Sequence, residues 1–333
     1  MEKINKILKK MNELGASDLH LVPDSCVWFR VINEMREGED SFTANELEDS
    51  LKKIIQKLKL WKGVNDINSL DFAYEFEGCR YRGNISKSKA GLGATFRAFP
   101  KEIPTFEDHH FPPILKDFVM EKSGMVVISG PTGSGKTTTL GAMLDYANEH
   151  RKGHIISIED PIEIVHSAKS CLFTQREVGT HCNSFYDGLM DSLRQDPDII
   201  LIGEVRRARE FQVALEAALT GHLVLTTSHA SSVVGAIQRL IDQFPGPDRD
   251  AAQSAFSECV VGVVCQTLLE GKDGKPIPTF EIMTANNAVR SSIRLGQFMN
   301  LKDPIYMGSN QGMTTMERYT EELVRKGLCE KPK

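Results

Sequence analysis

Residues 130–137 match the pattern G-x-x-x-x-G-K-[ST], which is typical of loops that bind nucleotide phosphates. Gly133 and Gly135 let the backbone turn so that successive N–H groups point at phosphate oxygens. Lys136 supplies a mobile positive charge, and the hydroxyl of Thr137 is suited to coordinate Mg²⁺. The residues predicted to bind the nucleotide here are Gly130, Pro131, Thr132, Gly133, Ser134, Gly135, Lys136, Thr137 and Thr138.

Two apolar runs farther along the chain end in carboxylates. The first, at 155–158, leads into Glu159, Asp160 and Glu163; the second, at 198–202, leads to Glu204. Crowded carboxylates repel one another unless a cation or an arginine lies nearby. Beside a phosphate-binding loop, Mg²⁺ and water are the expected neighbours, and the alternative for the first group is an acidic helix cap. In P-loop ATPases an acid after such a strand holds Mg²⁺.

Further charged residues follow the same runs. The arginines after Glu204 either stabilise phosphate charge or pair with surface acids; they are Arg206, Arg207 and Arg209. His222 is the first residue of the predicted strand at 222–227, and His229 follows that strand. His229 lies beyond its carboxyl end, where it can sense the γ-phosphate. His222 either shares that role or is a hydrogen-bonded core histidine.

The elements that must position these residues alternate along the chain. We predict strands at 125–128, 154–158, 198–202 and 222–227, and helices at 137–151, 184–195, 208–219 and 233–243. Short apolar strands alternating with helices indicate an α/β fold with a mainly parallel, doubly wound sheet. Ligands bind beyond the carboxyl ends of the strands in such sheets, which is where the carboxylates and His229 follow.

Residues 1–100 predict a smaller α+β domain. It opens with an amphipathic helix whose basic face is either solvated or in contact with a membrane surface. Thr43 and Glu46 form a capping-box pattern for a second helix, and antiparallel strands are expected at 70–76, 79–85 and 93–99. Strand alternation places Arg80 and Arg82 on one face. Together with Arg97 they form either a solvated face or a convergent positive patch.

Length and composition limit the class of protein. A chain of 333 residues favours two domains, and a net charge of -5 argues against a general nucleic-acid-binding surface. We expect a proline-containing linker at 101–114, with His109 and His110 exposed, then an ATPase-like domain at 115–285 and a helical region at 286–333. Seven scattered cysteines and the lack of a signal-peptide core predict reduced thiols and a cytoplasmic protein.

As a set, these segments resemble the secretion-superfamily ATPases, the hexameric motors of type II secretion, type IV secretion and type IV pili. Residues 130–137, 158–163, 196–204 and 220–229 are similar to their Walker A, Asp box, Walker B and His box. Within this family the chain looks most like the pilus retraction ATPases of the PilT type. Further segments that match in order are 17–21, 80–82, 96–97, 175–178, 266–268 and 312–316.

The resemblance implies a PAS-like N-terminal domain, a flexible linker and a RecA-like P-loop domain, assembled as a ring of six. It implies ATP and Mg²⁺ as cofactors, with Mg²⁺ held by Thr137 and Glu204, and with Glu163 orienting or deprotonating the attacking water. His222 and His229 would couple the γ-phosphate to neighbouring elements. The arginines implied to reach the nucleotide, across a subunit boundary in the ring, are Arg80, Arg82 and Arg97, and Glu159 and Asp160 complete the nucleotide-binding set.

The implied function is ATP-driven retraction of type IV pili, and hence twitching motility. The implied partner is the inner-membrane platform protein of the pilus, through which a cytoplasmic ring contacts the membrane; no nucleic acid is expected. An assembly or secretion ATPase is the alternative within the family, although those usually carry a longer N-terminal region and often a four-cysteine zinc insert. A DNA-translocating RecA-like motor and a non-hydrolysing nucleotide-binding regulator are alternatives of other classes.

Three positions depart from the family pattern: Arg207 where Asp is usual, Ser228 within the His box, and Leu295 where the retraction motif ends in an acid. The departure at Leu295 bears on whether the motor retracts or assembles pili more than on whether it hydrolyses ATP.

Overall fold

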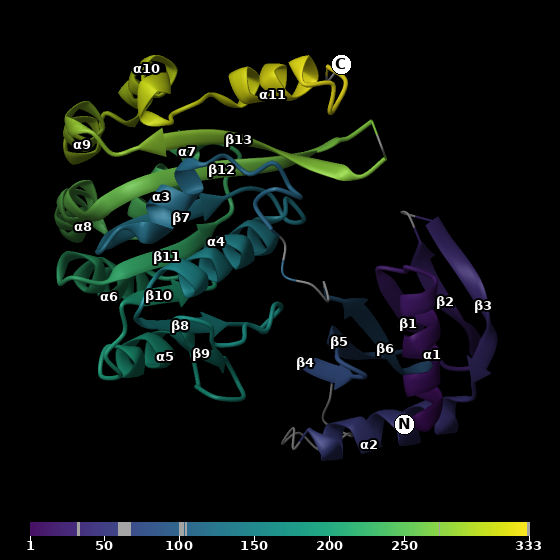
Figure 1. Cartoon of the computed structure of the whole chain (residues 1–333). Helices are drawn as coiled ribbons and strands as arrows, with labels where there is room; N and C mark the ends of the chain where they lie inside the picture. The colour runs from purple at the N-terminus through teal and green to yellow at the C-terminus, as the bar shows by residue number, and fades with distance from the viewer. Residues whose placement is uncertain (32–33, 59–67, 100–102, 104, 273, 332–333) are drawn as a thin grey trace. The chain divides into compact units, whose positions relative to one another are not determined.

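The computed structural model describes residues 1–31, 34–58, 68–99, 103, 105–272 and 274–331, and it divides into two compact units, Met1–Glu102 and Ile103–Lys333 (Figure 1). Of the predicted linker 101–114, residues 101, 102 and 104 lie outside the described residues, as does Pro100. The described remainder of that segment belongs to the second unit.

The first unit is an antiparallel sheet with two helices. Its elements are α1 (Glu2–Glu13), β1 (Asp18–Leu21), β2 (Ser25–Val31), β3 (Glu34–Phe42), α2 (Ala44–Lys57), β4 (Ser69–Phe76), β5 (Cys79–Ser88) and β6 (Gly91–Ala98). The strands lie in the order β3-β2-β1-β6-β5-β4. The predicted antiparallel run of 70–99 is confirmed as β4, β5 and β6, each paired with the next.

Local sequence signals account for both helices of this unit. Thr43 caps α2, accepting a hydrogen bond from the backbone N–H of Glu46, while the Glu46 carboxylate accepts one from the N–H of Thr43; the predicted capping box is confirmed. One face of α1 is buried, and Asn12 and Asn5 of this helix bond the hydroxyls of Tyr81 and Tyr74 at 2.6 Å. The helix is thereby fixed to the sheet through both apolar and polar contacts.

The second unit alternates strands with helices. Its elements are α3 (Ile114–Met120), β7 (Gly124–Ser129), α4 (Lys136–His150), β8 (His154–Glu159), β9 (Leu172–Glu177), α5 (Phe185–Ser192), β10 (Ile199–Ile202), α6 (Ala208–Leu219), β11 (Leu223–Ser228), α7 (Val233–Ile241), α8 (Gly246–Cys259), β12 (Val260–Glu270), β13 (Pro276–Thr284), α9 (Asn287–Arg294), η2 (Phe298–Leu301), α10 (Lys302–Met307), η3 (Ser309–Gln311) and α11 (Met316–Arg325).

The seven strands of this unit form one sheet in the order β13-β12-β7-β11-β10-β8-β9. All neighbouring pairs are parallel except β12 with β13. The predicted α/β, mainly parallel sheet is confirmed, and β7 lies inside it, between β12 and β11. Because the strands are parallel, the carboxyl ends of β7, β8, β10 and β11 meet at one edge, and the segments that follow them form the candidate site.

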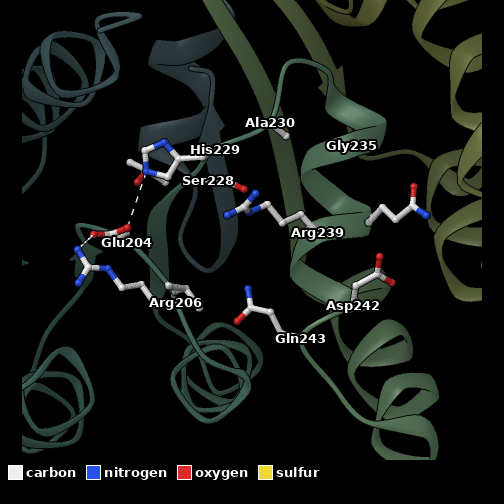
Figure 2. A pocket seen from close by; sticks show the side chains of 12 residues that line it. Glu204, Arg206, Ser228, His229, Ala230, Gly235, Arg239, Asp242 and Gln243 are labelled. Atoms are coloured by element: carbon white, nitrogen blue, oxygen red, sulfur yellow. Dashed lines mark hydrogen bonds and ion pairs between the residues drawn. The ribbon is translucent and has the colours of Figure 1, made fainter. Parts of the chain in front are cut away.

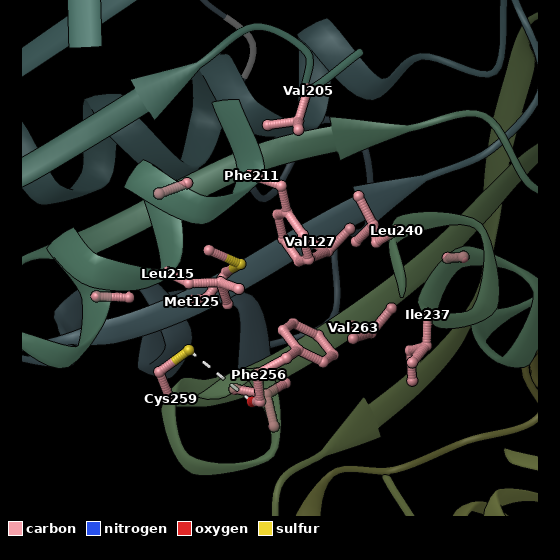
Figure 3. Packing of buried hydrophobic residues seen from close by; sticks show 14 of the residues in the cluster. Met125, Val127, Val205, Phe211, Leu215, Ile237, Leu240, Phe256, Cys259 and Val263 are labelled. Atoms are coloured by element: carbon pink, nitrogen blue, oxygen red, sulfur yellow. Dashed lines mark hydrogen bonds between the residues drawn. The ribbon is translucent and has the colours of Figure 1, made fainter. Parts of the chain in front are cut away.

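The core follows from strand alternation. In β7, Met125 and Val127 face one apolar cluster, together with Phe211 of α6 and Phe256 of α8 (Figure 3). Val126 and Ile128 face the opposite cluster, which includes residues of α3 and α4. Both faces of the sheet are therefore covered by helices, as a parallel sheet requires.

The remaining expectations concern the surface and the cysteines. All seven cysteines lie among the described residues and are free. Within the described ranges, every helix is too short or too polar to cross a bilayer. His109 stacks on Phe111 at 5.3 Å between ring centroids, is half-buried, and has a pKa lowered by burial, whereas His110 is exposed as expected.

Candidate nucleotide-binding site

The glycine-rich loop connects β7 to α4 with three left-handed glycines. Gly133 and Gly135 have φ of 78° and 85°, and Gly130 has φ of 151°, values that disfavour any residue with a Cβ. Gly130 is also confined by its neighbours, because a Cβ there would lie 2.3 Å from the carbonyl oxygen of Gln266. The loop conformation therefore requires the glycines that the motif supplies.

The loop presents backbone donors to a ligand. Among the described residues, the N–H groups of Gly133 and Gly135, and those of residues 136–138 in the first turn of α4, have no acceptor within the protein. Such groups at a helix start, with the helix dipole behind them, bind anions. The loop therefore fits a nucleotide phosphate group.

Lys136 is arranged to meet the same anion. Its Nζ donates to the carbonyl oxygens of Gly130 and Pro131 at 2.8 and 2.9 Å. Burial lowers the pKa of Lys136, while the charges of Glu204 and Glu163 act in the opposite direction. These carboxylates thus lie near enough to the ammonium group to influence its charge.

A residue of β12 fixes the loop and was not among the predicted site residues. The buried amide of Gln266 donates to the carbonyl oxygen of Ser134 and accepts from the hydroxyl of Thr139, both at 2.7 Å. The signal in the sequence is the polar pair Gln266 and Thr267 within the mostly apolar run 260–269, but the partners of Gln266 lie 127 and 132 positions away, so no local pattern connects them.

We expect Gln266→Ala to weaken nucleotide binding and to lower the free energy of unfolding by about 1–3 kcal/mol, because it leaves buried polar groups unpaired. Urea unfolding and titration with a fluorescent ADP analogue measure the two effects. Gln253→Ala is a matched control, since Gln253 is buried in α8 and donates to the carbonyl oxygen of Arg294, away from the loop. Equal nucleotide affinity in the two variants would contradict the role of Gln266.

Glu204 and His229 lie together at the same edge. Glu204 follows β10 and His229 follows β11, and His229 Nε2 lies 3.8 Å from a Glu204 carboxylate oxygen. The other carboxylate oxygen bonds Arg206. The hydroxyl of Thr227 donates to the carbonyl oxygen of Gly203 at 2.5 Å, which fastens the ends of the two strands to each other.

The turn after His229 is also held to the strand that carries the loop. The hydroxyl of Ser129 donates to the carbonyl oxygen of Ala230 and accepts from its N–H, both at 3.0 Å. Burial, followed by the charge of Lys136, lowers the pKa of His229, which favours the neutral form of its imidazole. A neutral imidazole has one N–H donor and one nitrogen acceptor.

A cavity of about 600 Å³ opens beside this pair (Figure 2). It extends from Glu204 and His229 to Asp242 and Gln243, which follow the last residue of α7. Arg239 extends from α7 toward Ser228 and His229 in this view. Asp242, which precedes Gln243, pairs with Arg249 at 2.6 Å, so its charge is already compensated. The cavity therefore offers room for solvent next to the carboxylate.

The acidic segment after β8 divides into three environments. Glu159 accepts from the hydroxyl of Ser157 at 2.7 Å and from the amide of Gln175 at 3.2 Å, and burial raises its pKa. Asp160 is exposed, whereas Glu163 is half-buried. Glu163 influences the pKa values of both Lys136 and Glu159, so the segment lies beside the loop.

Within one chain the structure places His222 away from the loop, and its role at the nucleotide beside His229 stays a prediction. His222 precedes β11, and its Nδ1 pairs with the carbonyl oxygen of Ala217 at 3.0 Å. Six strand residues separate it from the carboxyl end of β11, a distance of about 20 Å. Within one chain His222 is a structural histidine at the opposite edge of the sheet.

The three predicted arginines of the first unit share one face of its sheet. Arg82 pairs in register with Arg97 across β5 and β6, and Arg80 follows two positions away on the same face. Arg97 donates to Asp18 at 2.7 Å, and Arg82 lies 3.8 Å from Asp71. The side chains of Arg82 and Arg97 are exposed by 46% and 64%, so they remain accessible to an anion.

The three departures from the family pattern lie in different environments. Arg207 caps α6 without a side-chain hydrogen bond, and Glu210 accepts from the N–H groups of Arg206 and Arg207 instead. Ser228 is buried at the end of β11, and Leu295, directly after α9, is 64% exposed.

Comparisons with known proteins show which proteins this chain is similar to. Residues 107–294 match the family model described as type II/IV secretion system protein. The chain is 37% identical to the type IV pilus retraction ATPase PilT of Pseudomonas aeruginosa over 98% of its own length and 95% of the relative's. It is 40% identical to a twitching motility protein of Neisseria gonorrhoeae, over 78% of this chain and 70% of that one. A crystal structure of the pilus retraction motor PilT with bound ADP superimposes with a TM-score of 0.86 at 33% identity, covering 98% of this chain and 94% of that one.

Proposed function

Because this chain belongs to the family of type II/IV secretion system proteins, we propose that it is the motor that retracts type IV pili. The chain is an ATPase of this family. One observation carries the proposal: backbone donors of the glycine-rich loop that have no acceptor among the described residues lie beside Lys136, at the sheet edge where Glu204 and His229 also meet. The similarity to pilus retraction and twitching motility proteins supports retraction as the direction of work.

The chemistry assigned to the residues follows from their places. The loop and Lys136 bind the phosphates of ATP. The hydroxyl of Thr137 and the carboxylate of Glu204 are an oxygen donor pair suited to Mg²⁺, which supplies positive charge against the developing phosphate charge. Glu163 orients or deprotonates the attacking water, and His229 senses the γ-phosphate. Arg80, Arg82 and Arg97 contribute guanidinium charge to the nucleotide of a ring of six chains.

The proposed setting is the cytoplasmic face of the inner membrane. There the ring works on the platform protein of a pilus, and its only membrane contact is through that partner. The proposal goes beyond the family assignment in four respects: the binding of Mg²⁺, the assembly of six chains into a ring, the platform protein as partner, and the location at the inner membrane.

The function is tested by deleting the encoding sequence in the source organism and counting surface pili. We expect an excess of unretracted pili and loss of twitching motility, both restored by the intact chain. Absence of pili would instead identify an assembly motor and overturn retraction. Phosphate release by the purified chain, with and without added DNA, is measured in parallel, and we expect hydrolysis that DNA does not stimulate.

A further inference from the structure

The segment that carries Glu163 has no helix or strand of its own. It runs from the end of β8 to the start of β9, and among the described residues no regular hydrogen-bond ladder holds positions 160–171. A group that must orient a water molecule needs a fixed position, and a misplacement of about 1 Å can cost a hundredfold in rate. Some other part of the chain must therefore hold this segment.

The side chain of Gln175, on β9, holds the backbone on the far side of Glu163. Its Nε2 donates to the carbonyl oxygen of Ile164 at 2.9 Å, and its Oε1 accepts from the N–H of His166 at 2.8 Å. The same Nε2 lies 3.2 Å from the Glu159 carboxylate at the end of β8. One amide thus joins the strand end to the segment.

The side chain of Glu177 holds the backbone on the near side. It is buried, and its carboxylate accepts from the N–H of Ile162 at 3.1 Å. Gln175 and Glu177 are two positions apart on β9, so they project from the same face of that strand. Glu163 therefore lies between two points of attachment, one on each side of it in sequence.

A second element anchors the segment farther on. Asn148 of α4 donates to the carbonyl oxygen of Ser167 at 2.7 Å and accepts from the N–H of Lys169 at 3.0 Å. This helix begins at Lys136, in the phosphate-binding loop. The segment is thus bound both to the edge strand of the sheet and to the helix that carries the loop.

We propose that Gln175 is a positioning residue for hydrolysis, which sets the place of the Glu163 carboxylate by fixing the backbone of Ile164 and His166. The inference rests on the role given to Glu163 in the proposed function. The amide is specifically required because it offers donors and an acceptor on one planar group. Methionine has a similar length and offers neither.

The test is steady-state hydrolysis of ATP by Gln175→Met in the full chain. We expect kcat to fall about ten- to a hundredfold while KM for ATP changes by less than about threefold, because positioning acts on the chemical step. Thr174→Val is the matched control: Thr174 is the preceding residue on β9, and its hydroxyl bonds His154 rather than the segment. Its kcat should stay near that of the unaltered chain.

A double-mutant cycle with Glu163→Gln separates positioning from general damage. If Gln175 acts through Glu163, Gln175→Met costs less than about twofold in the Glu163→Gln background. An equal loss in both backgrounds, or an unchanged kcat in the single variant, would overturn the inference. A normal rate in Glu163→Gln alone would overturn the role of Glu163 and this inference with it.

A second variant covers the case in which Gln175→Met does not fold. Gln175→Glu keeps the shape of the side chain and the acceptor for His166, and it loses the donor to Ile164. We expect the same fall in kcat and the same result in the cycle. Full activity of Gln175→Glu would overturn the requirement for the amide.

Discussion

Glu204→Gln is expected to reduce ATP hydrolysis by about a hundredfold or more while the chain still binds ATP. Glutamine has the shape of glutamate but lacks its charge, so it neither attracts Mg²⁺ nor balances nearby cations. The Glu204 carboxylate interacts with three cationic or ionisable groups. It bonds Arg206, lies 3.8 Å from His229, and its charge raises the pKa of Lys136 against the larger lowering by burial. The phosphate-binding backbone of the loop does not contact it, which is why binding should survive.

The measurement is phosphate release under saturating ATP, together with titration of a fluorescent ATP analogue. Glu216→Gln is the matched control, because Glu216 is exposed on α6 and contacts Gln212 away from the site. Both variants remove one negative charge. If Glu204→Gln hydrolysed ATP at the rate of the control, the assignment of Glu204 would be wrong.

The parts of the fold that the sequence predicts are those encoded by neighbours in the chain. Residues 43 and 46 suffice for the cap of α2, and the apolar run before Gly130 suffices for β7. The predicted parallel sheet places Glu204 and His229 at one edge, and the structure brings them to 3.8 Å. The cap and the strand depend on local signals, whereas Glu204 and His229 meet because β10 and β11 pair in parallel.

Other features depend on contacts that no local pattern contains. β9 reads Leu-Phe-Thr-Gln-Arg-Glu, without alternation, and two of its polar side chains, Gln175 and Glu177, bond the backbone of the Glu163 segment. Gln266 meets the loop only after β12 has joined β7. The motif containing His222 suggested a role at the nucleotide, yet strand direction carries this residue to the opposite edge. The motifs therefore indicate the kind of chemistry, and the direction of the strands decides which motif residues reach the nucleotide site within one chain.

Arg82→Ala is expected to slow hydrolysis about ten- to a thousandfold in the assembled ring, with a smaller effect on ATP affinity. An arginine that approaches the phosphates stabilises charge mainly in the transition state, so kcat should change more than binding. Arg82 is suited to this role because its side chain is 46% exposed and its nearest carboxylate, Asp71, lies at 3.8 Å, a loose contact in water. Arg97, its neighbour across the strands, is by contrast held to Asp18 at 2.7 Å.

Arg36→Ala provides the control, because Arg36 lies on β3 of the same sheet and its 3.7 Å contact is with Glu34. Mixing two impaired variants, Arg82→Ala and Lys136→Ala, then shows whether Arg82 acts within its own chain or on a neighbouring one. In a ring that combines Arg82→Ala chains with Lys136→Ala chains, some boundaries place the intact arginine of one chain next to the intact loop of the other. Such a boundary holds a complete site only if the arginine acts on the loop of the neighbouring chain. Recovery of hydrolysis on mixing would establish action between subunits, and no recovery would confine it to one chain. Unchanged hydrolysis by Arg82→Ala alone, measured in assembled rings, would remove Arg82 from the site, since a transition-state charge of this kind cannot be lost without a cost in rate.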